Sequence, residues 1–147
     1  MSAPAPLLDA QTVQALVDAA TAARENAYSP YSLHTVGAAV LDADGRIHVG
    51  CNVEVVTLSQ SMHAERTAVA AMAVAGGRRL TAVAVVGPYS GVPCAECRQV
   101  LWEFAGADPD VVVVSAPLDE PVELLRMGEV YPRPYGPETK GIDPTRF

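Results

Sequence analysis

The chain has 147 residues, of which half are hydrophobic and 18% are charged, and its net charge is −7. No apolar run approaches the roughly 20 residues that a membrane-spanning helix requires, so we expect no membrane partner. The 10 Lys and Arg residues are scattered among 17 acidic ones, whereas a phosphate backbone is bound by concentrated positive charge, so we expect no nucleic-acid partner either.

The length is typical of one domain with its own hydrophobic core, and we predict a single domain over residues 1–147. The first six residues, MSAPAP, lack the basic start and the apolar stretch of a secretory signal. Among the three cysteines, Cys94 and Cys97 form a C-x-x-C, which in an intracellular protein is typical of a metal or redox pair rather than of a disulfide. We therefore expect a cytoplasmic protein.

The first predicted element is a helix after Asp9, which can cap it, with apolar residues at helical spacing on one face. It should end before Pro30, because a proline disfavours helix at the residue before it. Residues 36–41 predict a buried strand, 42–45 a turn and 47–52 the returning strand of a hairpin.

Cys51, the third cysteine, lies at the end of the returning strand of this hairpin. It alternates with Ile47 and Val49 along the strand, and we predict that the three side chains point inward. Cys51 is then a small buried hydrophobic residue rather than a metal ligand.

The second half alternates helices and strands. An alanine stripe predicts a helix over 63–75 that packs closely on a sheet and ends at Gly76-Gly77. Residues 80–87 and 111–114 predict buried strands, with a helix from about 94 to 104 between them, which implies parallel pairing by right-handed crossovers. A weak helix is predicted over 122–127, followed by an extended proline-rich tail from about residue 128.

Two short motifs begin these two helices. His63-Ala64-Glu65 and Pro93-Cys94-Ala95-Glu96-Cys97 form the H-x-E and P-C-x-x-C signature of a zinc-dependent deaminase. One imidazole and two thiolates can hold Zn²⁺ with a fourth position open to water, so His63, Cys94 and Cys97 are the predicted ligands.

Both motifs are expected at the carboxyl edge of the sheet, because each helix follows a parallel strand. Helix N-termini there favour thiolate over thiol at the two cysteines. Glu65 is two positions past His63 and points away from it, so it suits proton transfer better than ligation.

Alone, the C-x-x-C also fits structural zinc, a redox pair or coincidence, and the H-x-E also fits an ordinary helix start. The combination, in this order and at two helix starts, predicts catalytic zinc.

Beyond these motifs, the chain resembles the short-chain, usually tetrameric cytidine deaminases. The resemblance is carried by the segments YSPYS (28–32), VGAA (36–39), GCNVE (50–54), AERTA (64–68), PC (93–94), CRQVL (97–101) and EVYPRPYGP (129–137). It implies an α/β fold, a three-layer α/β/α sandwich around a mixed five-stranded sheet. It also implies hydrolytic deamination of a cytosine nucleoside, with a small-molecule substrate and a homotetramer, a dimer being the alternative.

The resemblance also assigns roles to single residues. Glu65 would move protons between water, N3 of the base and the departing ammonia, and the Ala64 N–H would contact the base carbonyl. Asn52 and Glu54 would hold the ribose hydroxyls, and Tyr135 would reach a neighbouring subunit's site and stack on the base.

Several positions depart from the family pattern. His63 stands where short-chain members usually have a third cysteine, yet Arg66 is still beside it, so we expect Arg66 to be electrostatically surplus or to lower the pKa of the water further. His34 stands where phenylalanine usually faces the pyrimidine, Leu58 replaces a common tyrosine, and Val55 replaces an asparagine.

Several alternatives to plain cytidine deamination stay open. The substrate can be a modified cytosine nucleoside or an antibiotic nucleoside of the blasticidin S type, although Glu54 favours a ribose-like partner. A non-catalytic, zinc-stabilised binding module is the alternative from a different class, and Glu65 argues against it because a structural site requires no such carboxylate. An editor of nucleic acids fits the acidic composition least.

Overall fold

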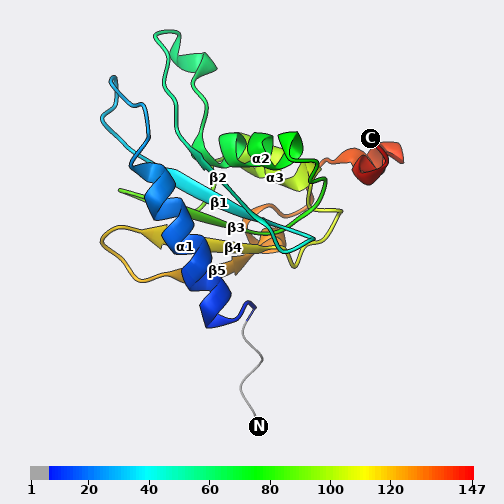
Figure 1. Ribbon diagram of the computed structural model, residues 1–147. Coiled ribbons are helices and arrows are strands. Elements are labelled where there is room, and N and C mark those ends of the chain that lie inside the picture. Colours follow the sequence, from blue (N-terminus) through cyan, green and yellow to red (C-terminus); the bar gives the residue numbers. More distant parts are fainter. Residues whose placement is uncertain (1–6) are drawn as a thin grey trace.

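A computed structural model describes residues 7–147 (Figure 1). The chain begins with helix α1 (Ala10–Arg24), which Asp9 caps by accepting a hydrogen bond from the Thr12 N–H, as predicted. The elements that follow are β1 (Gly37–Asp42), β2 (Ile47–Cys51), α2 (Ala64–Val74), β3 (Leu80–Gly87), α3 (Ala95–Glu103), β4 (Val112–Pro117), β5 (Glu123–Arg126) and α4 (Met127–Val130). Single 3₁₀ turns lie at Leu58–Gln60, Pro137–Lys140 and Pro144–Arg146.

The five strands form one mixed sheet in the order β2-β1-β3-β4-β5. Only β3 and β4 pair in parallel, and the other three pairs are antiparallel. Helix α1 lies across one face of the sheet, and α2 and α3 lie on the other (Figure 1). The predicted three-layer α/β/α architecture is confirmed.

The strand before α2 differs from the prediction. We expected a parallel-paired strand before each motif, but β2 is an edge strand that pairs antiparallel with β1. Because β2 and β3 are both antiparallel to β1, they run in the same direction and end at the same edge of the sheet. The two motifs therefore still meet at one edge.

Small residues let the helices approach the sheet closely. At Gly37 a Cβ atom would overlap the α1 backbone at Ala20 and Arg24. At Gly50 a Cβ would overlap the first turns of α2, at Ala64 and Ala68. The alanine-rich face of α2 thus packs against β2, as the alanine stripe predicted.

The predicted inward face of β2 is wrong. Ile47 and Val49 are exposed and Cys51 is only half-buried, whereas Gly50 and His48 lie on the side that α2 covers. Apolar residues do alternate along β2, but α2 covers the other face of this edge strand and packs on its small residue, Gly50. Cys51 is therefore not a core residue.

The helix predicted over 122–127 is also wrong, because most of this segment is β5. Its two leucines pack on opposite faces of the sheet: Leu125 joins the cluster under α2 and α3, and Leu124 joins the cluster under α1. This is the period of two that defines a strand.

The segment after residue 128, expected to be an extended tail, packs on α3. The Tyr131 hydroxyl donates to Gln99 Oε1 at 2.5 Å, and Gln99 Nε2 donates to the Tyr135 carbonyl at 2.7 Å. Trp102 Nε1 donates to Glu138 at 2.9 Å. Within residues 7–147, no helix has the length and apolar character needed to cross a membrane.

Candidate active site

Three potential metal donors meet where α2 and α3 begin. His63 is the N-cap residue of α2 and Cys94 the N-cap residue of α3, while Cys97 lies buried in the first turn of α3. His63 Nδ1 is 3.3 Å from Cys94 Sγ and 3.4 Å from Cys97 Sγ, and all three donor atoms lie within 4.8 Å of one another. The structure thus brings together the three side chains predicted as ligands.

This donor set fits zinc. With usual zinc–sulfur and zinc–nitrogen bond lengths, a tetrahedral angle separates the sulfur and nitrogen by about 3.6 Å, close to the two separations found here. Three protein donors also leave a fourth tetrahedral position open, which is typical of catalytic rather than structural zinc.

The state of Cys97 favours a metal site over a redox pair. The thiolate predicted at Cys97 from its place at a helix start is wrong for the metal-free chain. Burial raises the pKa of the Cys97 thiol, and the adjacent carboxylate of Glu65 and the sulfur of Cys94 raise it further, while Arg66 opposes them only in part. Reactive redox cysteines have lowered pKa values. A bound cation, in contrast, removes the proton from a coordinating thiol.

A cleft of about 470 Å³ opens beside the three donors, a size typical of small-molecule sites. Its walls come from side chains in four segments, which begin at Tyr31, Asn52, Leu58 and Val92. Glu65 and Ala64 are buried side chains at this wall, in the first turn of α2. The free N–H groups of a helix start point toward such a cleft, so Ala64 has a donor available for a ligand.

Glu54 and Asn52 line the same cleft and already hold the loop between α1 and β1. The Glu54 carboxylate accepts hydrogen bonds from the Ser32 hydroxyl and from the N–H groups of Tyr31 and Ser32, at 3.0 and 3.1 Å. These bonds, the Ser32 hydroxyl first, hold the pKa of Glu54 below its usual range against the opposing effect of burial. Glu54 is therefore an ionised acceptor with one of its roughly four lone-pair sites left for a ligand.

Asn52 uses both ends of its amide on the same loop. Its Oδ1 accepts from the Val36 N–H at 2.8 Å, and its Nδ2 donates to the His34 carbonyl at 2.7 Å. The side chain keeps one donor and one acceptor site free.

His34 lines the cleft, as predicted, and it has a partner that the sequence did not indicate. Its Nε2 lies 2.8 Å from the Tyr89 hydroxyl, and the two rings meet edge to face. Ser32 was missed in the same way. Partners 22 or 55 positions apart leave no local pattern in a sequence.

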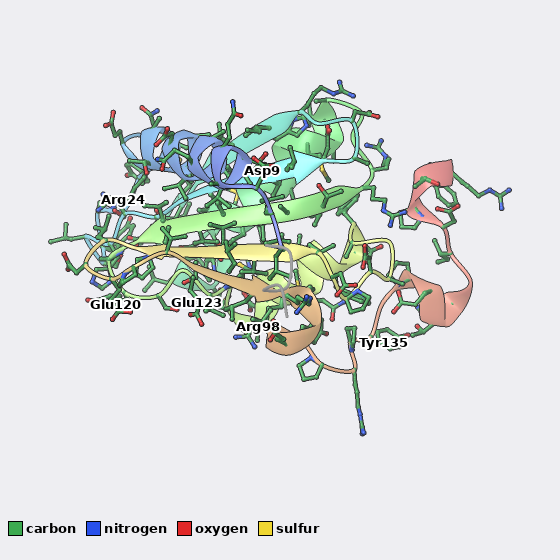
Figure 2. The ribbon with its side chains drawn as sticks, turned by 90° about the horizontal axis from the view of Figure 1, so that it is seen from below. Asp9, Arg24, Arg98, Glu120, Glu123 and Tyr135 are labelled. Atoms are coloured by element: carbon green, nitrogen blue, oxygen red, sulfur yellow. The ribbon has the colours of Figure 1, made fainter. Side chains whose placement is uncertain are left out.

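Tyr135 does not line the cleft of its own chain, and its side chain is exposed. Figure 2 shows it on the segment that follows α4, at the outside of the molecule. The predicted contact with a neighbouring subunit's site stays a prediction.

Arg66 links the two helices that begin at the potential metal donors. One of its terminal nitrogens donates to the Ser61 carbonyl at 2.8 Å, and the other lies 3.8 Å from the Glu96 carboxylate. Its Nε is buried and has no hydrogen-bond partner within residues 7–147. The guanidinium therefore lies between the loop before α2 and the first turn of α3.

Comparison with known proteins agrees with this geometry. Residues 10–115 match the family described as the cytidine and deoxycytidylate deaminase zinc-binding region. A cytidine deaminase of Mycobacterium tuberculosis is 42% identical over 119 residues, which cover 80% of this chain and 84% of that protein. One from Sporosarcina psychrophila is 38% identical over 130 residues, covering 86% and 93%. The crystal structure of cytidine deaminase from Burkholderia pseudomallei has a TM-score of 0.77 at 40% identity, covering 83% of this chain and 98% of that one.

The fold and the donor cluster define a zinc-dependent hydrolase of the α/β/α type. More narrowly, the chain belongs to the cytidine and deoxycytidylate deaminase family. Its cofactor is zinc, because the matched family region is a zinc-binding one and includes all three donors.

Proposed function

We propose that this protein, as a single domain over residues 1–147, deaminates a cytosine nucleoside by hydrolysis, most simply cytidine or deoxycytidine. Water replaces the amino group at C4, so cytidine and water give uridine and ammonia. The observation that carries the proposal is the cluster of His63, Cys94 and Cys97 beside the buried carboxylate of Glu65, in one cleft.

The metal donors, Glu65 and the Ala64 N–H have separate roles in this reaction. His63, Cys94 and Cys97 would hold the zinc, which when bound would lower the pKa of a water at its fourth position toward 7. Glu65, which is not a donor in the cluster, accepts a proton from the attacking water and delivers it to N3. It then takes the proton of the hydroxyl now on C4 and gives it to the amino group, which leaves as ammonia while the carbonyl forms. The Ala64 N–H donates to the base carbonyl and holds the ring in place.

The sugar lies against the loop wall in this proposal. Glu54 accepts a ribose hydroxyl at its remaining lone-pair site, and Asn52 uses its free donor or acceptor. The bonds that both make to the loop hold them still before the substrate arrives, which lowers the entropy lost on binding. A nucleoside is therefore preferred over free cytosine.

We further propose a cytoplasmic homotetramer, with a dimer as the alternative arrangement. Tyr135 supports this, because an aromatic ring exposed on a proline-stiffened segment outside its own cleft is available to a neighbouring subunit.

A modified cytosine nucleoside is the second candidate substrate, and the polar ring of His34 in the cleft wall favours it. An imidazole offers a hydrogen bond that an apolar aromatic ring does not. Leu58, also at the cleft, replaces a second aromatic position of the family pattern.

The test follows the ultraviolet absorbance of cytidine, deoxycytidine, free cytosine and blasticidin S in parallel with the zinc-loaded protein. We expect turnover of the two nucleosides and little of free cytosine. Glu65→Gln is the matched control: it should retain zinc and lose about 10²- to 10⁴-fold in kcat. Preferred turnover of blasticidin S would favour the second candidate, and no turnover of any compound would support a zinc-stabilised binding module instead.

A further inference from the structure

His34 is held by the chain at three points, two on its backbone and one on its ring. Its backbone N–H donates to Ser32 Oγ at 3.0 Å, and its carbonyl accepts from Asn52 Nδ2 at 2.7 Å. The ring is held through Nε2 by the Tyr89 hydroxyl, 2.8 Å away. An exposed histidine on a loop is normally free to rotate, so three restraints on one residue require an explanation.

The backbone beside His34 is also constrained. Leu33, whose side chain is 80% exposed, has a φ of 61°, the left-handed region that a bulky residue rarely adopts. Such a conformation persists only where surrounding contacts impose it, and it is concentrated at functional sites. Here the Glu54 carboxylate imposes it by holding the N–H groups of the two preceding residues.

Tyr89 comes from the segment that also carries Val92 and Cys94 of the cleft wall, although Tyr89 itself does not line the cleft. It lies in the segment between β3 and α3, five positions before Cys94, whereas His34 lies between α1 and β1. The edge-to-face contact, with ring centroids 4.8 Å apart at 84°, therefore joins the loop wall to the segment that carries a zinc ligand. Within residues 7–147, Nδ1 of His34 has no hydrogen-bond partner, so it is the ring nitrogen left for a ligand.

From this geometry we infer that Tyr89 is a positioning residue for substrate selection. It fixes the orientation of the His34 ring through Nε2, so that Nδ1 is the ring nitrogen left for a nucleoside in the cleft. Tyr89 does not contact the reacting atoms, and its effect acts through His34. The inference rests on the proposed nucleoside deamination for its kinetic consequence, but not for its structural one.

The structural consequence is tested without substrate. The chain has three histidines, so nitrogen-detected NMR of the zinc-loaded protein gives three imidazole spin systems. Tyr89→Phe, which removes only the hydroxyl, should shift the ring nitrogens of His34 and leave those of His48, which is bonded to Asp42, unchanged. Unchanged His34 signals would overturn the inference whether or not the protein is a deaminase.

The kinetic consequence uses a double-mutant cycle. Tyr89→Phe should raise KM for the best nucleoside about three- to ten-fold, the effect of one lost hydrogen bond, with kcat within about two-fold. In a His34→Phe background the same change should have no effect on KM. Tyr28→Phe, on the same loop as His34, is the matched control, because no hydrogen bond of its hydroxyl is formed within residues 7–147, and it should leave KM unchanged.

Two kinetic outcomes contradict the inference. One is an equal rise in KM with and without the His34 imidazole, which would mean that Tyr89 acts independently of it. The other is a fall in kcat at constant KM, which would place Tyr89 among the groups that act in the chemical step. Absence of turnover by the wild-type protein would count against the proposed function alone, since the NMR result is independent of it.

Discussion

Gly50→Ala should affect both the stability and the activity of this protein. A Cβ at this position would come closer than 3.0 Å to the backbone of Ala68 and Ala64 and to the hydroxyl of Thr67. Two of these neighbours are helix backbone, which cannot rotate away as a side chain can, so α2 must move off β2. Overpacking of this kind costs about 2–3 kcal/mol, which for a chain of this length lowers Tm by about 5–10 °C.

The same displacement should reach the metal site, because Ala64 directly follows the ligand His63. A shift of about 1 Å in a catalytic group lowers the rate up to about 100-fold, so we expect a roughly ten- to hundred-fold fall in kcat/KM. Thermal unfolding, zinc content and nucleoside kinetics on one preparation measure all three consequences.

Gly45→Ala is the matched control for this prediction. Gly45 lies in the turn between β1 and β2, where a Cβ meets nothing within 4 Å, but its φ is +83°. The substitution should therefore cost about 1 kcal/mol from the left-handed backbone alone and leave kcat/KM unchanged. If Gly50→Ala unfolds at the wild-type temperature, the close approach of α2 to β2 is wrong. If it is destabilised but fully active, the link from that approach to the zinc site is wrong.

Three further predictions concern other parts of the chain. Arg66→Gln should leave zinc bound and shift the pH–rate profile only modestly, because the arginine contacts no zinc donor through a hydrogen bond; metal analysis showing loss of zinc would contradict this. Burial raises the pKa of Asp42, but hydrogen bonds with His48 and with backbone N–H groups more than offset this effect, and the pKa of Asp42 lies below 3.8. Asp42→Asn should therefore lower the free energy of unfolding by about 1–3 kcal/mol at pH 7. In urea unfolding, this loss should become progressively smaller below pH 3.8, because the wild-type carboxylate is then protonated. A difference that grows toward acid would refute the assignment. Truncation before Tyr131 should raise KM if the tail completes a neighbouring site, and unchanged kinetics would remove that role.

Long periodic segments and the zinc motifs were predictable because their information is local. The cap at Asp9, the alanine stripe of α2 and the two motifs each lie within a few consecutive residues, and the structure has them as predicted. The helix α3, for the same reason, begins at the residue after Cys94.

The errors arose where tertiary contacts decide the outcome. Leu124 and Leu125 are adjacent, and a pair of leucines in a short segment fits a helix or a strand equally well until pairing with β4 decides. On β2 the apolar residues Ile47 and Val49 predicted that their face is buried, but both are exposed. Helix α2 covers the opposite face, where its close approach leaves room only for the glycine at position 50. The role of Tyr89 leaves no local pattern, because its partner His34 is 55 positions away in the sequence.

The position of the three donors has a consequence for how the folded chain is maintained. His63 and Cys94 are 31 positions apart and each begins a helix, so one ion held between them fastens a loop that contains α2 and β3. A ligand that binds the folded chain in preference to the unfolded one stabilises it by mass action. The zinc concentration would then control how long the chain stays folded, in addition to its catalytic activity. Chelated protein should be cut faster by proteases in the Gly76–Arg79 connection of that loop, well before any loss of overall secondary structure.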